Sequence, residues 1–127
     1  MQSHIVKAMI VLFVLCVAVA AEPRKASEPR SSKWPAVRAA YLEEHPQCEV
    51  CGDETGLQVH HVIPFHVDPK RELDPNNLIT LCTGATNCHL MFGHLKNFRS
   101  WNPDVRKDAA IWREKIKKRP MPVEGVK

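Results

Sequence analysis

Four cysteines in the middle of the chain limit most strongly what it can fold into. They form two close pairs, Cys48 with Cys51 and Cys82 with Cys88, and Gly52 gives the first pair the turn residue that a zinc knuckle needs. Tetrahedral zinc takes four thiolates from two such pairs once the fold brings them together. The wider second pair also suits disulfides, which form in an oxidising compartment. The spacing favours one structural zinc ion, with two disulfides as the alternative.

The N-terminal segment differs in composition from the rest of the chain. Residues 5–20 carry one charge, on Lys7, and end in small residues. Their apolar run is shorter than the roughly 20 residues that a membrane-spanning helix needs, and small residues suit a signal peptidase. We therefore predict a signal peptide over residues 1–20 and a secreted or periplasmic protein that has no stable membrane association after cleavage. An uncleaved signal that anchors the protein in a membrane is the alternative.

Composition divides the remainder of the chain into three parts. Residues 21–33 alternate proline, serine and charged residues without an apolar period, which predicts a flexible linker. Residues 34–120 form the expected folded module, and residues 121–127 form a tail. A module of roughly 90 residues has a marginal hydrophobic core, so a metal ion or disulfides would stabilise it.

Apolar periodicity and chain-breaking residues predict five elements within this module. They are a helix over residues 34–44, strands over residues 57–63 and 77–81, a short helix over residues 88–98, and a final helix with Asn102 as its N-cap and Pro120 as its stop. The strands are joined by residues 64–76, a connection long enough to suggest a functional loop. We therefore expect an α+β fold.

Three motifs lie between or beside the cysteine pairs. They are His60-His61-Val62-Ile63-Pro64, Asp74-Pro75-Asn76-Asn77-Leu78-Ile79-Thr80-Leu81-Cys82 and Cys88-His89. Preceded by Cys48-x-x-Cys51, they resemble the zinc-containing, ββα-metal form of the HNH endonuclease family from Cys48 to His94. The resemblance implies a small ββα-metal module with a zinc knuckle, to which this chain adds flanking helices.

The same resemblance implies a function and a role for each residue. The chain would be a metal-dependent endonuclease that hydrolyses phosphodiester bonds, with Mg, Mn or Zn as its catalytic ion beside the structural zinc. His60 and His89 would bind the catalytic ion, with His94 as a third ligand. His61 would be the general base that activates water, and Asn77 would hold the base in place. An unperturbed histidine pKa of about 6.5 suits a base at neutral pH.

Two departures from regular geometry leave parts of this assignment open. Adjacent residues of a strand point to opposite faces, so His60 and His61 can share a site only at an irregular strand end, and their roles could be exchanged. Gly93 stands where the family places its last histidine, which makes His94 five residues from His89, a poor spacing for an α-helix. The position of His66 is equally open, because it can face the site or the solvent.

Charge gives separate support for a nucleic-acid partner. We expect this partner to be DNA, with RNA as the alternative. Nine basic and three acidic residues lie between Lys96 and Arg119. We predict that Lys115, Lys117 and Lys118 contact backbone phosphates, although most such runs form a solvated helix face. A catalytically inactive, zinc-stabilised nucleic-acid-binding module is the main alternative to the enzyme. A small disulfide-bonded extracellular protein without metal is the second alternative.

Overall fold

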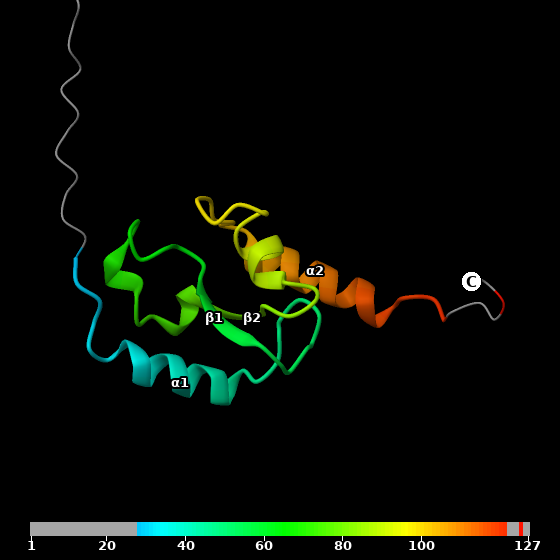
Figure 1. The fold of residues 1–127 in the computed structure, drawn as a ribbon, viewed down its shortest axis with the longest axis horizontal. Helices are drawn as coiled ribbons and strands as arrows, with labels where there is room; N and C mark the ends of the chain where they lie inside the picture. Colours follow the sequence, from blue (N-terminus) through cyan, green and yellow to red (C-terminus); the bar gives the residue numbers. More distant parts are fainter. Residues whose placement is uncertain (1–27, 122–124, 126–127) are drawn as a thin grey trace, which may run out of the picture.

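The computed structural model describes residues 28–121 and Gly125, so the predicted signal peptide and most of the predicted linker lie outside the described residues. The elements, in chain order, are α1 (Trp34–Glu44), β1 (Leu57–His61), the 3-10 turns η1 (Pro69–Arg71) and η2 (Pro75–Asn77), β2 (Leu78–Cys82), the π-helical turn η3 (His89–Gly93) and α2 (Val105–Lys117). Figure 1 shows α1 and α2 on either side of the two-stranded sheet. The predicted α+β fold is confirmed. Within the described residues, no helix has the length and apolar character to cross a membrane.

The two strands form an antiparallel hairpin in which His60 pairs with Ile79 and His61 with Leu78. β1 ends two residues before the predicted end at Ile63. The backbone N–H of Ile63 donates to the Asn77 side chain at 2.8 Å instead of continuing the strand. β2 begins one residue later than predicted, because Asn77 closes the η2 turn.

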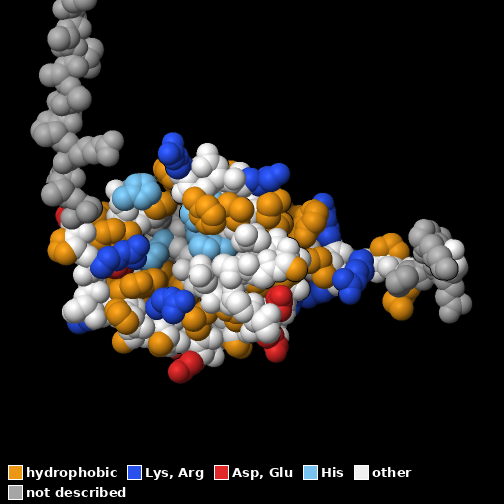
Figure 2. Space-filling model, in the orientation of Figure 1, with side chains coloured by type: hydrophobic (Ala, Val, Ile, Leu, Met, Phe, Trp, Pro, Cys, Tyr) orange, Lys and Arg blue, Asp and Glu red, His pale blue; other side chains and the backbone are white. Residues whose placement is uncertain are grey.

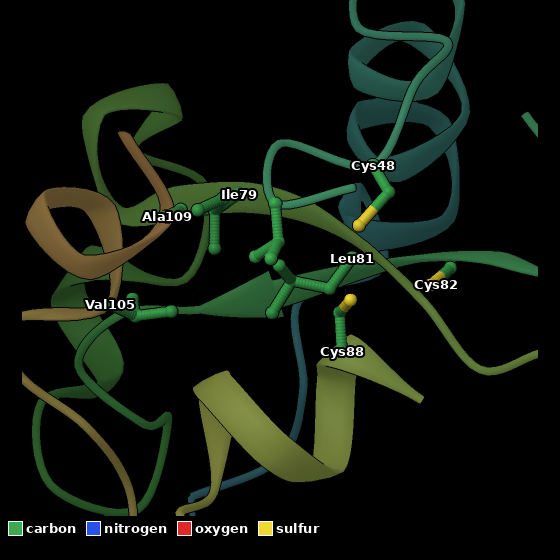
Figure 3. Packing of buried hydrophobic residues seen from close by; sticks show 8 residues of the cluster. Cys48, Ile79, Leu81, Cys82, Cys88, Val105 and Ala109 are labelled. Carbon is green, nitrogen blue, oxygen red and sulfur yellow. The ribbon is translucent and has the colours of Figure 1, made fainter. Parts of the chain in front are cut away.

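The core is small and includes the cysteine sulfurs. All five residues of β2 are buried. Ile79 and Leu81 share one cluster with Val50 of the knuckle and with Val105 and Ala109 of α2, and the buried cysteines Cys48, Cys82 and Cys88 complete it (Figure 3). Because thiols form part of the only hydrophobic cluster among the described residues, the cysteine site and the core are stabilised together.

Helix α1 has the predicted bounds and packs against the sheet. Its buried Tyr41 donates a hydrogen bond to the carbonyl of Leu78 at 2.7 Å. The end of the predicted linker is bound to the module, since Arg30 forms an ion pair with Glu72 at 3.3 Å and the Ser31 N–H donates to the same carboxylate at 2.9 Å. Glu72 is itself buried.

The predictions for the last two helices need correction. The helix expected over residues 88–98 is limited to five residues, because the chain turns away after Gly93. Helix α2 starts at Val105 instead of directly after Asn102, and Asn102 is not its N-cap. The Asn102 side chain instead bonds the Phe92 carbonyl at 3.0 Å and the Asp108 carboxylate at 2.7 Å, so it ties η3 to α2.

Candidate active site

The four cysteines that the sequence singles out meet at one point. Their sulfur atoms all lie within 4.8 Å of one another, and none of the cysteines in the described residues is in a disulfide. The knuckle turn is closed by the Gly52 N–H, which donates to the Cys48 carbonyl at 2.8 Å, while Gly52 has a left-handed φ of +81°. A convergence on one centre fits a single zinc ion better than two separate disulfides.

Thr86 belongs to this cysteine site, although no sequence motif marks it. Its hydroxyl oxygen lies 3.2 Å from the sulfur of Cys82 and 3.7 Å from those of Cys51 and Cys88. Burial raises the pKa of the Cys82 thiol, but hydrogen bonds from Thr86 and from the Cys88 backbone outweigh it and lower the pKa to about 7. Burial raises the pKa of Cys48 and of Cys88. Metal binding at this site therefore has to displace protons, which makes it dependent on pH.

A second cluster is made of histidines only. His60 comes from β1, while His89 and His94 stand at the two ends of η3, and one ring nitrogen of each lies within 4.8 Å of the others. His60 Nδ1 lies 3.2 Å from His89 Nε2. Two nitrogens bound to one tetrahedral ion at about 2.0–2.1 Å are about 3.3 Å apart, so this spacing fits a shared metal. His60 Nε2 is buried without a hydrogen-bond partner in the described residues.

The π-helical turn solves the spacing problem of His89 and His94. Hydrogen bonds in a π-helix join residues five apart, so two side chains at this spacing lie on the same side. The two imidazole centroids are 5.0 Å apart. Gly93 leaves room for the His60 ring, since a Cβ on it would lie 3.0 Å from His60 Cε1. The glycine that breaks the expected pattern is therefore the residue on which the His60 ring packs.

The hydrogen bond and the burial of these histidines prepare them as ligands. His94 Nδ1 lies 2.7 Å from the Ser100 carbonyl, which can only accept, so Nδ1 carries the proton and Nε2 keeps its lone pair. Burial, and then the neighbouring His89, His94 and His61, lower the pKa of His60 to about 3. Burial, followed by the proximity of His94, also lowers the pKa of His89. Neutral imidazoles are the form that binds metal.

His61 stands apart from the cluster of His60, His89 and His94 but lines the same pocket. Its Nε2 lies 2.9 Å from the Glu72 carbonyl, which makes Nε2 the protonated nitrogen and leaves Nδ1 with its lone pair. The ring packs against Trp34 with centroids 4.5 Å apart. Burial lowers its pKa, against the opposing effect of the bond to Glu72. Both histidines of the pair line the pocket, although both lie within the paired part of β1.

Asn77 joins the two ends of the connection between the strands. Its fully buried side chain accepts from the Ile63 N–H at 2.8 Å and donates to the carbonyls of Ile63 at 3.0 Å and Arg71 at 3.1 Å. Asn76, the neighbouring candidate, is exposed. The buried asparagine therefore fixes the backbone that leaves His61, and its predicted role in holding the base stays a prediction.

The histidines open into a pocket of about 310 Å³. It is lined by Arg30, Val59, His60, His61, Pro64, Phe65, His66, His89 and His94. Figure 2 shows histidine side chains gathered at this hollow, with hydrophobic and basic side chains around them. His66 is exposed at the rim, with its ring 6.2 Å from that of Trp101. His66 was expected to face either the site or the solvent. It lines the pocket and also contacts solvent.

Comparison with known families decides what this arrangement resembles. A family model for HNH endonucleases matches residues 48–94. The predicted resemblance is confirmed over that segment, which contains both clusters and Asn77. The match indicates a nuclease or nucleic-acid-binding function. No curated protein and no solved structure matches the chain.

Several residues outside the HNH segment complete or flank its pocket. Arg30 and Trp34 precede the segment, and Ser100 follows it. These residues could not be predicted, because no sequence motif marks them and only the fold brings them to the histidines. The one available signal was the aromatic Trp34 at the start of a predicted helix.

The lysines that were predicted to bind phosphate lie away from the histidine pocket. Lys115, Lys117 and Lys118 are on or directly after the last turn of α2, and none lines the histidine pocket. Lys117 and Lys118 both pair with Glu114, at 2.9 and 3.7 Å. The Lys115 ammonium lies 5.5 Å from the centroid of the Trp112 ring.

Proposed function

We propose that this chain is a metal-dependent endonuclease that hydrolyses phosphodiester bonds of nucleic acid. One observation carries the proposal: three imidazole ligands and a fourth imidazole with an available lone pair line a single pocket. A domain that only binds nucleic acid would not need a general base next to a metal site. The HNH match over the same residues supports the same chemistry.

His60, His89 and His94 would hold the catalytic ion, because their ring nitrogens converge and because burial lowers the pKa of His60 and of His89. No carboxylate joins this cluster in the described part of the chain. Imidazoles suit zinc and similar transition metals, whereas magnesium prefers oxygen ligands, so we favour zinc over magnesium at this site. When bound, the ion would neutralise charge that develops on the phosphate and on the leaving oxygen.

His61 would act as the general base. Its Nδ1 would accept the proton of the attacking water, while the Glu72 carbonyl keeps the proton on Nε2 and stabilises the imidazolium that forms. The Trp34 ring beside it restricts rotation of the imidazole. Asn77 would act as a positioning residue, since it holds the backbone at Ile63, two residues beyond the base.

Arg30 would bind the phosphate in the same pocket. Its guanidinium lies 4.6 Å from the centroid of the Phe65 ring and is paired with Glu72, so it is held at the pocket wall. A guanidinium presents parallel N–H groups that match phosphate oxygens. The ion pair with Glu72 leaves the outer donors of Arg30 for the substrate.

Metal content and cleavage, measured together, test the proposal. The purified chain should bind two metal ions and cleave single- or double-stranded oligonucleotides of DNA or RNA in a metal-dependent reaction. One zinc ion per chain, with nucleic-acid binding and no cleavage, would support the inactive binding module. No metal and two disulfides would support the extracellular protein without metal.

The predicted signal peptide adds a proposal about location. We infer that the enzyme acts outside the cytoplasm, on nucleic acid that reaches a secreted or periplasmic protein. Mass spectrometry of protein exported from its host should give a chain that begins near residue 21. A full-length chain in the membrane fraction would support the anchored alternative.

A further inference from the structure

The segment that follows η3 exposes large apolar side chains. We call residues His94–Trp101 the aromatic loop. Phe98 is 65% exposed and Leu95 56% exposed, although both are of a size that cores normally bury. Figure 1 shows this yellow segment projecting beyond η3, away from the sheet. Both side chains therefore keep more than half of their surface open to solvent.

The aromatic loop is held in one shape by hydrogen bonds. Leu95 and Lys96 have left-handed φ angles of 51° and 68°, which side-chain-bearing residues adopt only when the surroundings impose them. The Lys96 N–H donates to the Leu90 carbonyl at 2.9 Å, and the Ser100 hydroxyl donates to the His94 carbonyl at 2.6 Å. The Asn97 side chain accepts from the Arg99 N–H at 3.0 Å. Phe98 is therefore presented on a fixed turn, which lowers the entropic cost of binding through it.

This turn lies against the histidine cluster. The Phe98 ring centroid is 5.0 Å from that of His94 and 6.2 Å from that of His89. The bond from His94 Nδ1 to the Ser100 carbonyl links the loop directly to one of the proposed ligands. A molecule that contacts the outer face of Phe98 would therefore adjoin whatever is bound at the histidines.

The charge of the loop indicates the kind of partner. Lys96 and Arg99 flank Phe98, and residues 94–101 contain no acidic residue. Hydrophobic side chains lie between basic ones in this part of Figure 2, above the histidines. Aromatic rings among basic side chains are the usual means of binding single-stranded nucleic acid, because bases stack on the rings and phosphates pair with the cations.

We propose that the aromatic loop is a base-stacking site, with Phe98 stacked on a nucleobase next to the phosphate held at the histidines. The proposal rests on the proposed nuclease function and specifies its substrate. A base inside an intact duplex has both faces covered, so Phe98 favours single-stranded or locally opened nucleic acid. Lys96 and Arg99 then contact the neighbouring phosphates.

Binding assays on a full-length chain that carries His61→Ala test the loop without cleavage. The first probe is a fluorescent single-stranded DNA of about 12 nucleotides, which is within the usual range of single-strand binding sites. The second probe is the same DNA with its central bases replaced by abasic residues. We expect Phe98→Ala to weaken binding to the first probe by about 5- to 150-fold, the size of one stacked base. Phe98→Tyr should bind as the parent does, and Ile111→Ala, which removes an exposed apolar side chain of α2, serves as the control.

The abasic probe gives the decisive comparison. With no base to stack on, the parent and Phe98→Ala chains should bind it equally. An equal loss on both probes, or no loss on either, would overturn the stacking proposal while leaving the nuclease function intact. If the parent chain binds neither probe nor any duplex, the proposed function fails as well. A dimer that Phe98→Ala disrupts in sedimentation would show that the loop binds a second copy instead, which also overturns the proposal.

Discussion

Gly93→Ala should weaken metal binding at the histidines while leaving the fold largely intact. A Cβ at this position would lie 3.0, 3.1 and 3.2 Å from three atoms of the His60 ring. These distances are shorter than nearly all contacts that a Cβ makes, so the buried ring has to move by a few tenths of an ångström. Metal–ligand distances tolerate about 0.2 Å, so His60 would no longer reach the position that it shares with His89.

The expected size of each effect separates this change from general destabilisation. Overpacking lowers the free energy of unfolding by about 1–3 kcal/mol, whereas replacing a helical glycine by alanine raises it by about 1 kcal/mol. The net decrease should therefore be only about 0–2 kcal/mol. Affinity for the metal ion at the histidines should fall by about 10- to 100-fold or more. That range is typical of mutations in residues that only orient a metal ligand.

Calorimetric titration of zinc into a chain whose cysteine site is already filled measures this affinity. Gly84→Ala is the matched control, because its Cβ would meet only Asp53 Oδ2, at 3.9 Å. The control should bind the second ion as the wild type does. If Gly93→Ala also binds it with wild-type affinity, His60 is not a ligand in the proposed geometry and the reasoning fails.

Three further predictions follow from other parts of the structure. Thr86→Val should weaken zinc binding at the cysteines by about 10- to 100-fold in a chelator competition assay, and unchanged affinity would remove Thr86 from the site. Asn77→Ala should lower the free energy of unfolding by about 3 kcal/mol in urea, because it removes three buried hydrogen bonds, and a loss below about 1 kcal/mol would contradict this. The folded pKa of His60, about 3, lies below the unfolded value of about 6.5, so metal-free protein should lose stability as the pH falls from about 6.5 toward 3. His60→Gln should reduce that slope in thermal melts, and an equal slope in both proteins would count against it.

The sequence was sufficient to predict the elements and motifs that depend on local patterns. The bounds of α1 follow from its apolar spacing and from Pro46, and the cysteine and histidine motifs identify the segment that matches the HNH family. Asn77 could be chosen over Asn76 because it directly precedes the second strand, and its buried hydrogen bonds agree with that choice.

Features that depend on packing could not be predicted in the same way. The π-helical turn that aligns His89 with His94 has no recognised sequence period, and the need for a glycine under His60 appears only in three dimensions. Arg30 was assigned to a linker by composition, although a buried carboxylate distant in sequence binds it. The lysines of α2 were selected by charge alone, which does not reveal which face of a helix lies near a site.

The single-turnover cleavage rate of His61→Ala, with its metal content measured on the same sample, tests the proposed mechanism most directly. The variant should retain both metal ions and the wild-type fold, yet cleave about 100- to 10,000-fold more slowly, the usual size of a general-base contribution, at every zinc concentration. His89→Ala, in contrast, should bind the second ion weakly and recover part of its activity as zinc is raised. Cleavage by metal-loaded His61→Ala at near the wild-type rate would show that His61 is not the base and would contradict the mechanism.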